Sequence, residues 1–179
     1  MNRAVFLDRD GVLNQTILRD GKPYPPQTAS EVRIVDGAAQ ALSQLKKAGF
    51  LLICVTNQPD VARGQQSKAN VERIHAALLQ TLPLDALYCC YHDDVDDCEC
   101  RKPKPGMLLA AARDYCIDLA ESFLVGDRWR DIDASQNAGC RSVLIDYHYQ
   151  ERAPAAPPDA RVASLREAVD WILAQARSR

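Results

Sequence analysis

The chain has 179 residues, of which 47% are hydrophobic and 26% are charged, and its formal net charge is −2 at pH 7. This length suits one domain, residues 1–179, and the balanced charge without a long basic block argues against a nucleic-acid partner. The sequence has no run of 18 apolar residues and reaches an apolar strand at once, so we expect a cytoplasmic protein without a membrane span or signal peptide.

Short apolar strands alternate with amphipathic helices along the chain. The pattern predicts strands over residues 4–7, 50–55, 86–91, 122–125 and 142–145. It predicts helices over residues 37–48, 67–82, 105–116, 131–138 and 164–176. Residues 14–36, which contain Gly21 and three prolines, are expected to be irregular. The alternation predicts an α/β fold of three layers, in which helices cover both faces of a mostly parallel sheet.

Two carboxylates, Asp8 and Asp10, directly follow the first predicted strand. Such a pair suits phosphoryl transfer through an aspartyl-phosphate, because one carboxylate can attack while the other handles the proton of the leaving oxygen. Gly11 lets the backbone approach a phosphate closely. Taken alone, the pair could equally be a solvated exit from the strand.

Three further motifs lie just past predicted strands or before a helix. The hydroxyl and two amides of Thr56-Asn57-Gln58 can donate to phosphate oxygens, although an ordinary polar turn is the alternative. Lys102 can neutralise phosphate charge, or it can belong to a solvated turn. Asp127 can complete a Mg²⁺ site with Asp8, or it can cap a helix, a role that fits Asp131 better.

The order of these motifs along the chain resembles that of the haloacid-dehalogenase-like (HAD) phosphatases. Their four signature motifs match Asp8-x-Asp10, Thr56, Lys102 and Gly126-Asp127-x-x-x-Asp131. The resemblance spans residues 4–146 and implies a Rossmann-like fold. It also implies that Asp8 attacks phosphorus, that Asp10 protonates the leaving oxygen and then activates water, and that Thr56 and Lys102 grip the phosphate. Mg²⁺ would be held by the Asp8 carboxylate, the Asp10 backbone carbonyl and Asp127.

A cluster of cysteines predicts a second metal. Seven cysteines exclude a complete set of internal disulfides, and in a reducing compartment such clusters indicate metal ligation. Cys90-x-His92 and Cys98-x-Cys100 fit a closed, structural Zn²⁺ site, in which Cys89 could replace Cys90; the alternative is a set of incidental cysteines. Zinc would hold the loop at about 89–102. The intervening acidic residues are expected to be solvated: Asp93, Asp94, Asp96 and Asp97.

The sequence around the zinc loop narrows the resemblance to the branch of heptose-bisphosphate and histidinol-phosphate phosphatases. Residues 8–14, D-R-D-G-V-L-N, are similar to the heptose enzymes, as are Thr56-Asn57-Gln58 and Ala62-Arg63-Gly64. The histidinol-phosphate enzymes usually lack the Asn and the Ala-Arg-Gly segment. Pro59-Asp60 replaces the family's Ser-Gly, and Arg128 replaces its usual Lys. The resemblance therefore supports the chemistry more firmly than the substrate.

The resemblance implies a Mg²⁺-dependent phosphatase that converts D-glycero-D-manno-heptose 1,7-bisphosphate to heptose 1-phosphate. The alternatives are a phosphatase for histidinol phosphate or another small ester and, more distantly, a non-catalytic zinc-stabilised binding protein. With a zinc loop in place of a large cap, the rim would select a small phosphorylated sugar, and we expect a monomer. The candidate substrate-binding residues are Arg9, Asn57, Gln58, Arg63, Arg101 and Arg128.

Overall fold

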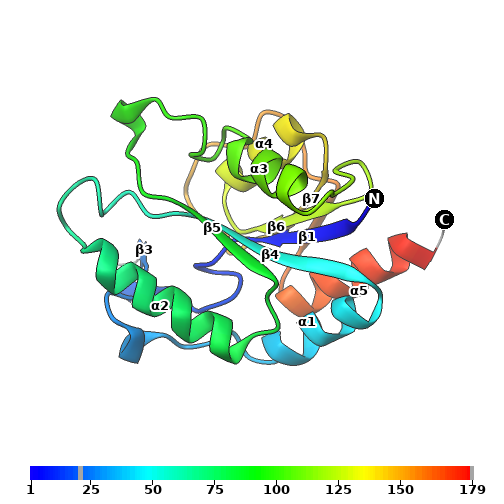
Figure 1. Cartoon of the computed structure of the whole chain (residues 1–179), viewed down its shortest axis with the longest axis horizontal. Helices are drawn as coiled ribbons and strands as arrows, with labels where there is room; N and C mark the ends of the chain where they lie inside the picture. The colour runs from blue at the N-terminus through cyan, green and yellow to red at the C-terminus, as the bar shows by residue number, and fades with distance from the viewer. Residues whose placement is uncertain (20–21, 178–179) are drawn as a thin grey trace.

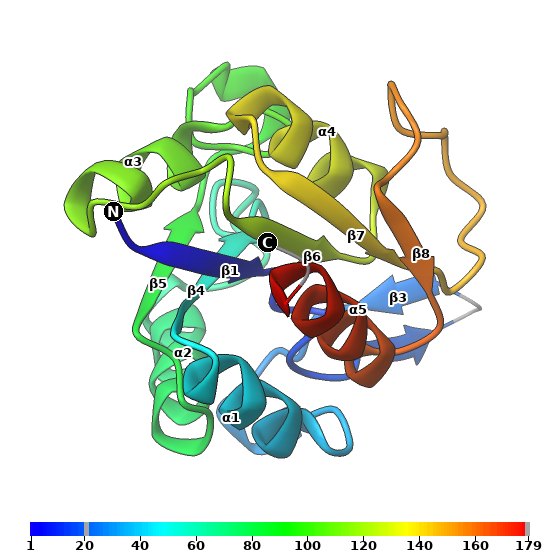
Figure 2. The same ribbon diagram turned by 90° about the vertical axis from the view of Figure 1, so that its right-hand side faces the viewer.

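A single parallel sheet organises the part of the chain that the computed structural model describes, residues 1–19 and 22–177. Its strands are β1 (Arg3–Leu7), β4 (Phe50–Asn57), β5 (Ala86–Cys90), β6 (Phe123–Gly126), β7 (Arg141–Ile145) and β8 (Ala160–Val162). Within these described residues the order across the sheet is β5-β4-β1-β6-β7-β8, and all neighbours run parallel (Figure 1, with β8 labelled in Figure 2).

Helices cover both faces of this sheet. They are α1 (Ala38–Lys47), α2 (Lys68–Thr81), α3 (Gly106–Asp114), α4 (Trp129–Ala138) and α5 (Leu165–Arg177). Figures 1 and 2 show α1, α2 and α5 on one side and α3 and α4 on the other. The predicted three-layer α/β fold is confirmed. Within the described residues, no helix combines the length and apolar character needed to cross a bilayer.

The buried strands explain why the sequence shows continuous apolar runs. Along β1, Val5 and Leu7 pack into the core beneath α1 and α5, whereas Ala4 and Phe6 pack into the core beneath α3. Successive side chains of a strand point to opposite faces, so a strand covered on both sides needs apolar residues throughout. The same requirement makes Leu52 and Ile53 of β4 enter different cores.

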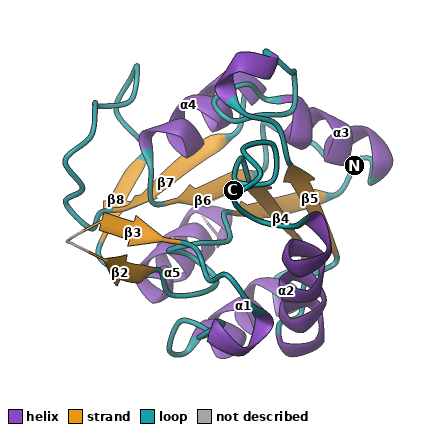
Figure 3. Ribbon diagram, turned by 90° about the vertical axis from the view of Figure 1, so that its left-hand side faces the viewer, coloured by secondary structure: helices purple, strands orange, loops and turns teal. Residues whose placement is uncertain are grey.

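The structure differs from the sequence-based expectation in two segments. Residues 14–36 are not wholly irregular: β2 (Ile17–Arg19) and β3 (Lys22–Tyr24) form an antiparallel hairpin separate from the main sheet (Figure 3), followed by a 3-10 turn, η1 (Ala29–Glu31). Gly21 lies outside the described residues. The short strand β8 also went unpredicted, because half-exposed residues at a sheet edge carry little hydrophobic signal.

Three adjacent strands position the functional motifs. In the sheet, β1 lies between β4 and β6, and Leu7 is level with both Cys54 and Val125. Residues that follow β1, β4 and β6 therefore emerge side by side at the carboxyl edge. Open parallel sheets bind ligands at this edge.

Aromatic side chains pack together at the opposite end of the sheet, where β4 and β6 begin. Phe123 of β6 is 1% exposed, and its ring meets those of Phe50 and Trp171 edge-on, each with a centroid separation of 5.9 Å. Such pairs add to the stabilisation that burial of the rings provides.

We expect Phe123→Ala to lower the free energy of unfolding by about 3–5 kcal/mol, because it leaves a cavity in a packed core. Urea denaturation would measure this change. Leu109→Ala on α3 is the control, since Leu109 is 47% exposed and surface changes usually shift stability by only about 0.5 kcal/mol. Equal losses in the two variants would contradict this account of the core.

Candidate active site

The predicted motifs meet around one cavity of about 600 Å³ at the carboxyl edge of the sheet. Residues that are far apart in sequence line it, and they come from the ends of β1, β4 and β6 and from the loop before α3. Among the predicted site residues, those that line the cavity are Asp8, Asp10, Thr56, Asn57, Gln58, Arg63, Arg101, Lys102, Asp127 and Arg128.

Lys102 is the cation at the centre of this arrangement. Its Nζ donates to Asp8 Oδ1 at 2.8 Å, to Asp131 Oδ1 at 2.6 Å and to the Val55 carbonyl at 2.8 Å. Burial alone would lower the pKa of Lys102, but the two carboxylates outweigh burial and raise it. Lys102 therefore stays charged and has all three N–H donors satisfied.

Three buried carboxylates form a candidate cation site beside Lys102. Oxygens of Asp8, Asp127 and Asp131 lie within 4.8 Å of one another. Asp131 is occupied, because its Oδ1 accepts from Lys102 and its Oδ2 accepts from the backbone N–H of Arg128 at 3.1 Å. By contrast, Asp127 Oδ1 is buried without a hydrogen-bond partner. An unsatisfied buried carboxylate oxygen facing another carboxylate fits a hard divalent cation such as Mg²⁺.

The pKa shifts of Asp8 and Asp127 also favour a bound cation. Burial, reinforced by the charges of Asp8 and Asp131, raises the pKa of Asp127 well above its usual value. Burial also raises the pKa of Asp8 to about 6, although Lys102 opposes the shift. Both carboxylates are therefore destabilised as anions, and a bound cation would relieve that destabilisation.

Glycines allow these carboxylates to approach the backbone. Gly11 has φ +88°, and a Cβ there would collide with the carboxylate of Asp127. At Gly126, a Cβ would overlap the side chain of Asp131. Both positions therefore require a residue without a side chain.

Asp10 is held from several sides. Its Oδ1 accepts from Asn14 Nδ2 at 2.9 Å, and its Oδ2 accepts from Gln58 Nε2 at 3.0 Å and from Arg9 Nε at 3.1 Å. Burial would raise the pKa of Asp10, but the charge of Arg9 and these hydrogen bonds outweigh it and lower the pKa. Gln58 Nε2 also donates to the Thr56 hydroxyl at 2.9 Å, so the residues after β4 are tied to Asp10.

Arg9 departs from its predicted place in the substrate site. Its side chain is fully buried, and Arg9 is not among the residues that line the cavity. Instead, its guanidinium pairs with Asp10 and lies 3.1 Å from Nε2 of His75 on α2. The expectation that Arg9 contacts substrate is corrected, because the charge of Arg9 is already neutralised beneath the site.

The side chain of Asn57 hydrogen-bonds to the backbone of Lys102. Its Nδ2 donates to the Lys102 carbonyl at 3.0 Å, and its Oδ1 accepts from the Lys102 backbone N–H at 3.1 Å. This reciprocal pair links the end of β4 to the segment that carries Lys102. Asn57 lines the cavity, but its described contacts brace the site.

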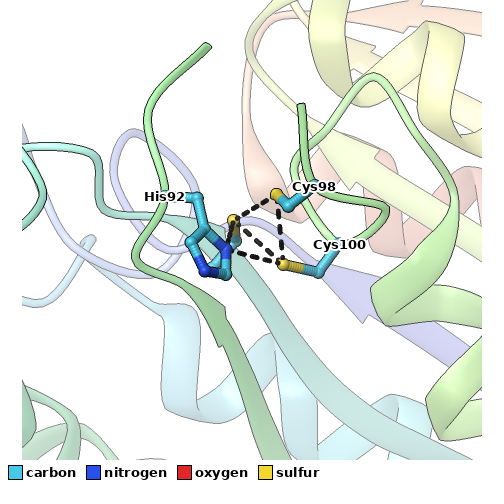
Figure 4. A group of neighbouring side chains, drawn as sticks. His92, Cys98 and Cys100 are labelled. Carbon is cyan, nitrogen blue, oxygen red and sulfur yellow. Dashed lines mark hydrogen bonds between the residues drawn. The ribbon is translucent and has the colours of Figure 1, made fainter. Parts of the chain in front are cut away.

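The structure brings together the four predicted zinc ligands, Cys90, His92, Cys98 and Cys100. Figure 4 labels three of them, His92, Cys98 and Cys100. Five of the six separations between the four ligand atoms range from 3.1 Å to 3.7 Å, and all four atoms lie within 4.8 Å of one another. Tetrahedral zinc with bonds of about 2.3 Å to sulfur and 2.0 Å to nitrogen would place such atoms roughly 3.5–3.8 Å apart. The group fits zinc, and it contains Cys90 rather than Cys89.

The acidic part of the zinc loop is paired with arginines that line the cavity. Asp94 accepts from Arg101 Nε at 2.8 Å and from Arg130 Nη1 at 3.0 Å. Asp93 binds the fork of Arg63 at 2.6 Å and 2.7 Å, and these hydrogen bonds lower the pKa of Asp93 to about 2. Asp94 is solvated as expected, with its side chain 54% exposed, but both aspartates also pair with arginines and so connect the zinc loop to the cavity wall.

Several cavity residues were not predicted as site residues. Asp131 was interpreted mainly as a capping residue, although its place in the Gly126-Asp127-x-x-x-Asp131 motif was a usable signal. Arg130 and Asp94 gave no local signal, because only the folded chain brings α4 beside the zinc loop. The region around the β2–β3 hairpin also contributes to the cavity through Thr16, Tyr24, Pro25 and Gln27.

Comparison with known proteins agrees with this geometry. Residues 99–168 match the HAD-hydrolase-like family model. The chain is 36% identical over 191 residues to the D-glycero-D-manno-heptose-1,7-bisphosphate 7-phosphatase of Thermosynechococcus vestitus, with 94% of each chain covered. It is 35% identical over 183 residues to the corresponding 7-phosphatase of Escherichia coli K12, and the match covers 95% of this chain and 87% of that protein.

A solved structure supports the same assignment. The D,D-heptose 1,7-bisphosphate phosphatase of B. bronchiseptica, crystallised with magnesium and phosphate, has a TM-score of 0.81 and 32% identity to this chain. The match covers 97% of this chain and 99% of that one. Whole-length similarity in sequence and in fold thus accompanies the convergent carboxylates and lysine, and the chain belongs to the heptose-1,7-bisphosphate 7-phosphatase family of HAD-like hydrolases.

Proposed function

We propose that this chain is a Mg²⁺-dependent phosphatase that removes the 7-phosphate of D-glycero-D-manno-heptose 1,7-bisphosphate and releases heptose 1-phosphate. The observation that carries the proposal is the meeting of Asp8, Asp10, Lys102 and Asp127 at one cavity. Relatives named for this reaction cover nearly the whole chain, and a similar structure was solved with magnesium and phosphate.

The first half of the reaction transfers the phosphoryl group to the protein. A carboxylate oxygen of Asp8 attacks phosphorus, and the bond between phosphorus and the sugar oxygen breaks. The electron pair of that bond stays on the sugar oxygen, which takes a proton from Asp10. Thr56 borders the cavity beside Asp8, and its hydroxyl can donate to a phosphate oxygen. Lys102, whose three N–H donors already bind protein oxygens, supplies positive charge close to the phosphate position.

The second half regenerates the protein. Asp10, now a carboxylate, takes a proton from a water molecule as the water oxygen attacks phosphorus. The bond between phosphorus and Asp8 then breaks, and inorganic phosphate leaves. Positioning and electrostatics carry most of the catalysis in such transfers, so the rigid hydrogen bonding around Asp10 suits both proton steps.

The carboxylates of Asp8 and Asp127, together with the backbone carbonyl of Asp10, would hold Mg²⁺. When bound, the ion supplies positive charge that offsets the repulsion between nucleophile and phosphate. Asp131 supports the site indirectly, since it fixes Lys102 and the backbone at Arg128. The unpaired Oδ1 of Asp127 supports this assignment.

The arginines of the cavity wall would recognise the rest of the substrate. Arg101 is 8% exposed and faces the cavity from the zinc loop, where a planar guanidinium suits a second phosphate or a pair of hydroxyls. Arg63 and Arg128 also line the cavity, each paired with an acidic residue. We propose zinc bound by the four-residue cluster as the structural support of this wall.

A substrate panel would test the function. We expect the highest kcat/KM with the heptose 1,7-bisphosphate, and lower values with hexose bisphosphates and histidinol phosphate. Asp8→Asn should lower kcat by at least roughly 10³-fold in a folded protein, because it removes the nucleophile. Asp170→Asn, on the exposed side of α5, is the matched control. Near-normal turnover by Asp8→Asn would exclude the covalent mechanism.

Magnesium binding should weaken at low pH. The pKa of Asp8 is about 6 and that of Asp127 is raised, so protons compete with the ion below neutral pH. Below these pKa values, the apparent Kd should rise about tenfold per pH unit for each proton displaced. Calorimetric titration of metal-free protein at pH 5 and at pH 7.5 would measure it, and equal affinities would contradict the direct involvement of these carboxylates.

Zinc removal should act on substrate binding more than on chemistry. We expect Cys98→Ser to lose zinc, to loosen the loop that carries Arg101 and to raise KM for the bisphosphate. Metal analysis and steady-state kinetics would measure both effects. Cys116→Ser is the control, since Cys116 is exposed and outside the cluster. Unchanged KM after verified loss of zinc would contradict a structural role in the cavity wall.

A further inference from the structure

We propose that Arg9 and His75 are positioning residues that fix one oxygen of the Asp10 carboxylate, so that the other oxygen delivers the proton to the leaving alcohol. This inference rests on the proposed phosphatase function and deepens it, because it assigns a support to the acid–base group. Neither Arg9 nor His75 lines the cavity, so both would act from beneath it through Asp10.

Arg9 contacts only one oxygen of the Asp10 carboxylate, Oδ2, among the contacts of the described residues. Its Nη2 lies 2.8 Å from Asp10 Oδ2, and its Nε donates to the same oxygen at 3.1 Å. The guanidinium is fully buried, and a buried arginine keeps its charge and needs a partner. Loss of this pair would leave an uncompensated cation beneath the site, so the ion pair between Arg9 and Oδ2 should persist throughout the reaction.

The two carboxylate oxygens of Asp10 accept different numbers of hydrogen bonds. Gln58 also donates to Oδ2, so that oxygen has both lone pairs engaged. Within the described residues, Oδ1 accepts one side-chain hydrogen bond, from Asn14 Nδ2. Oδ1 therefore has a lone pair left for a proton. When the bond between phosphorus and the sugar oxygen breaks, the proton passes from Oδ1 to that oxygen, and Arg9 stabilises the carboxylate that remains.

His75 fixes the orientation of the guanidinium. Its Nε2 lies 3.1 Å from Arg9 Nη1, and arginine can only donate, so Nε2 accepts and the histidine is neutral. Burial, followed by the charge of Arg9, lowers the pKa of His75 to about 4, in keeping with this assignment. His75 belongs to α2 and is 6% exposed. Its ring therefore accepts from Arg9 Nη1 beneath the cavity, away from solvent.

Substrates with different leaving groups can test the positioning role. A sugar alcohol is a poor leaving group that needs the proton, whereas 4-nitrophenolate leaves with little help. We expect Arg9→Met to lower kcat/KM for the heptose bisphosphate about 100-fold, since general acid catalysis contributes about 10²–10⁴-fold. The loss with 4-nitrophenyl phosphate should be about tenfold smaller. Inhibition by inorganic phosphate should not change.

Two variants at His75 provide a second route if Arg9→Met does not fold. His75→Leu removes the acceptor and should lower the ratio of sugar-ester to aryl-ester kcat/KM about tenfold. His75→Gln keeps an oxygen acceptor and should restore the wild-type ratio. Arg161→Met is the matched control, because Arg161 pairs with Asp146 away from the cavity and should leave the ratio unchanged.

The outcomes separate this inference from the function on which it rests. Equal losses with the two substrates, or a His75→Gln variant that behaves like His75→Leu, would overturn the positioning role. Wild-type protein that hydrolyses neither ester would instead overturn the proposed phosphatase. A selective loss with the sugar ester, rescued by glutamine, would support both.

Discussion

The buried ammonium of Lys102 is the interaction on which the site depends. It joins Asp8, which follows β1, to the backbone of β4 and to Asp131 of α4 through three hydrogen bonds. Removing either carboxylate would leave an incompletely compensated charge in a buried setting, which is strongly destabilising. The same ion pairs that anchor the lysine therefore hold three segments of the chain in register around the phosphate position.

The buried surroundings of Asp8 and Asp10 also shift the pKa values of these two carboxyl groups in opposite directions. Asp8 faces burial and other acids, which raise its pKa, whereas Asp10 is surrounded by donors that lower its pKa. Two aspartates separated by one residue thus have different environments, because β1 ends between two neighbouring strands. Without a cation, these directions favour protonated Asp8 and ionised Asp10. A cation bound by Asp8 and Asp127 would restore the ionised form of Asp8 that nucleophilic attack requires.

Ion pairs also connect the zinc loop to the arginines that line the cavity. Asp93 and Asp94 pair with arginines that line the cavity, and the loop leads directly into Arg101 and Lys102. Exposed ion pairs add little stability, so their contribution is to place the guanidinium groups rather than to hold the fold. The loop that carries the Cys/His cluster therefore forms part of the cavity wall.

The sequence alone determined the layered fold, since apolar runs and amphipathic periods depend on burial, and every predicted strand and helix end lies within two residues of its observed place. It also indicated the signature residues, because their chemistry is local to strand ends. Only the tertiary structure decided that Arg9 lies beneath the cavity, that Asp131 anchors Lys102 and that Asp94 pairs with Arg130. Those contacts join residues distant in the chain, and a linear pattern contains no information about which charges will share a buried space.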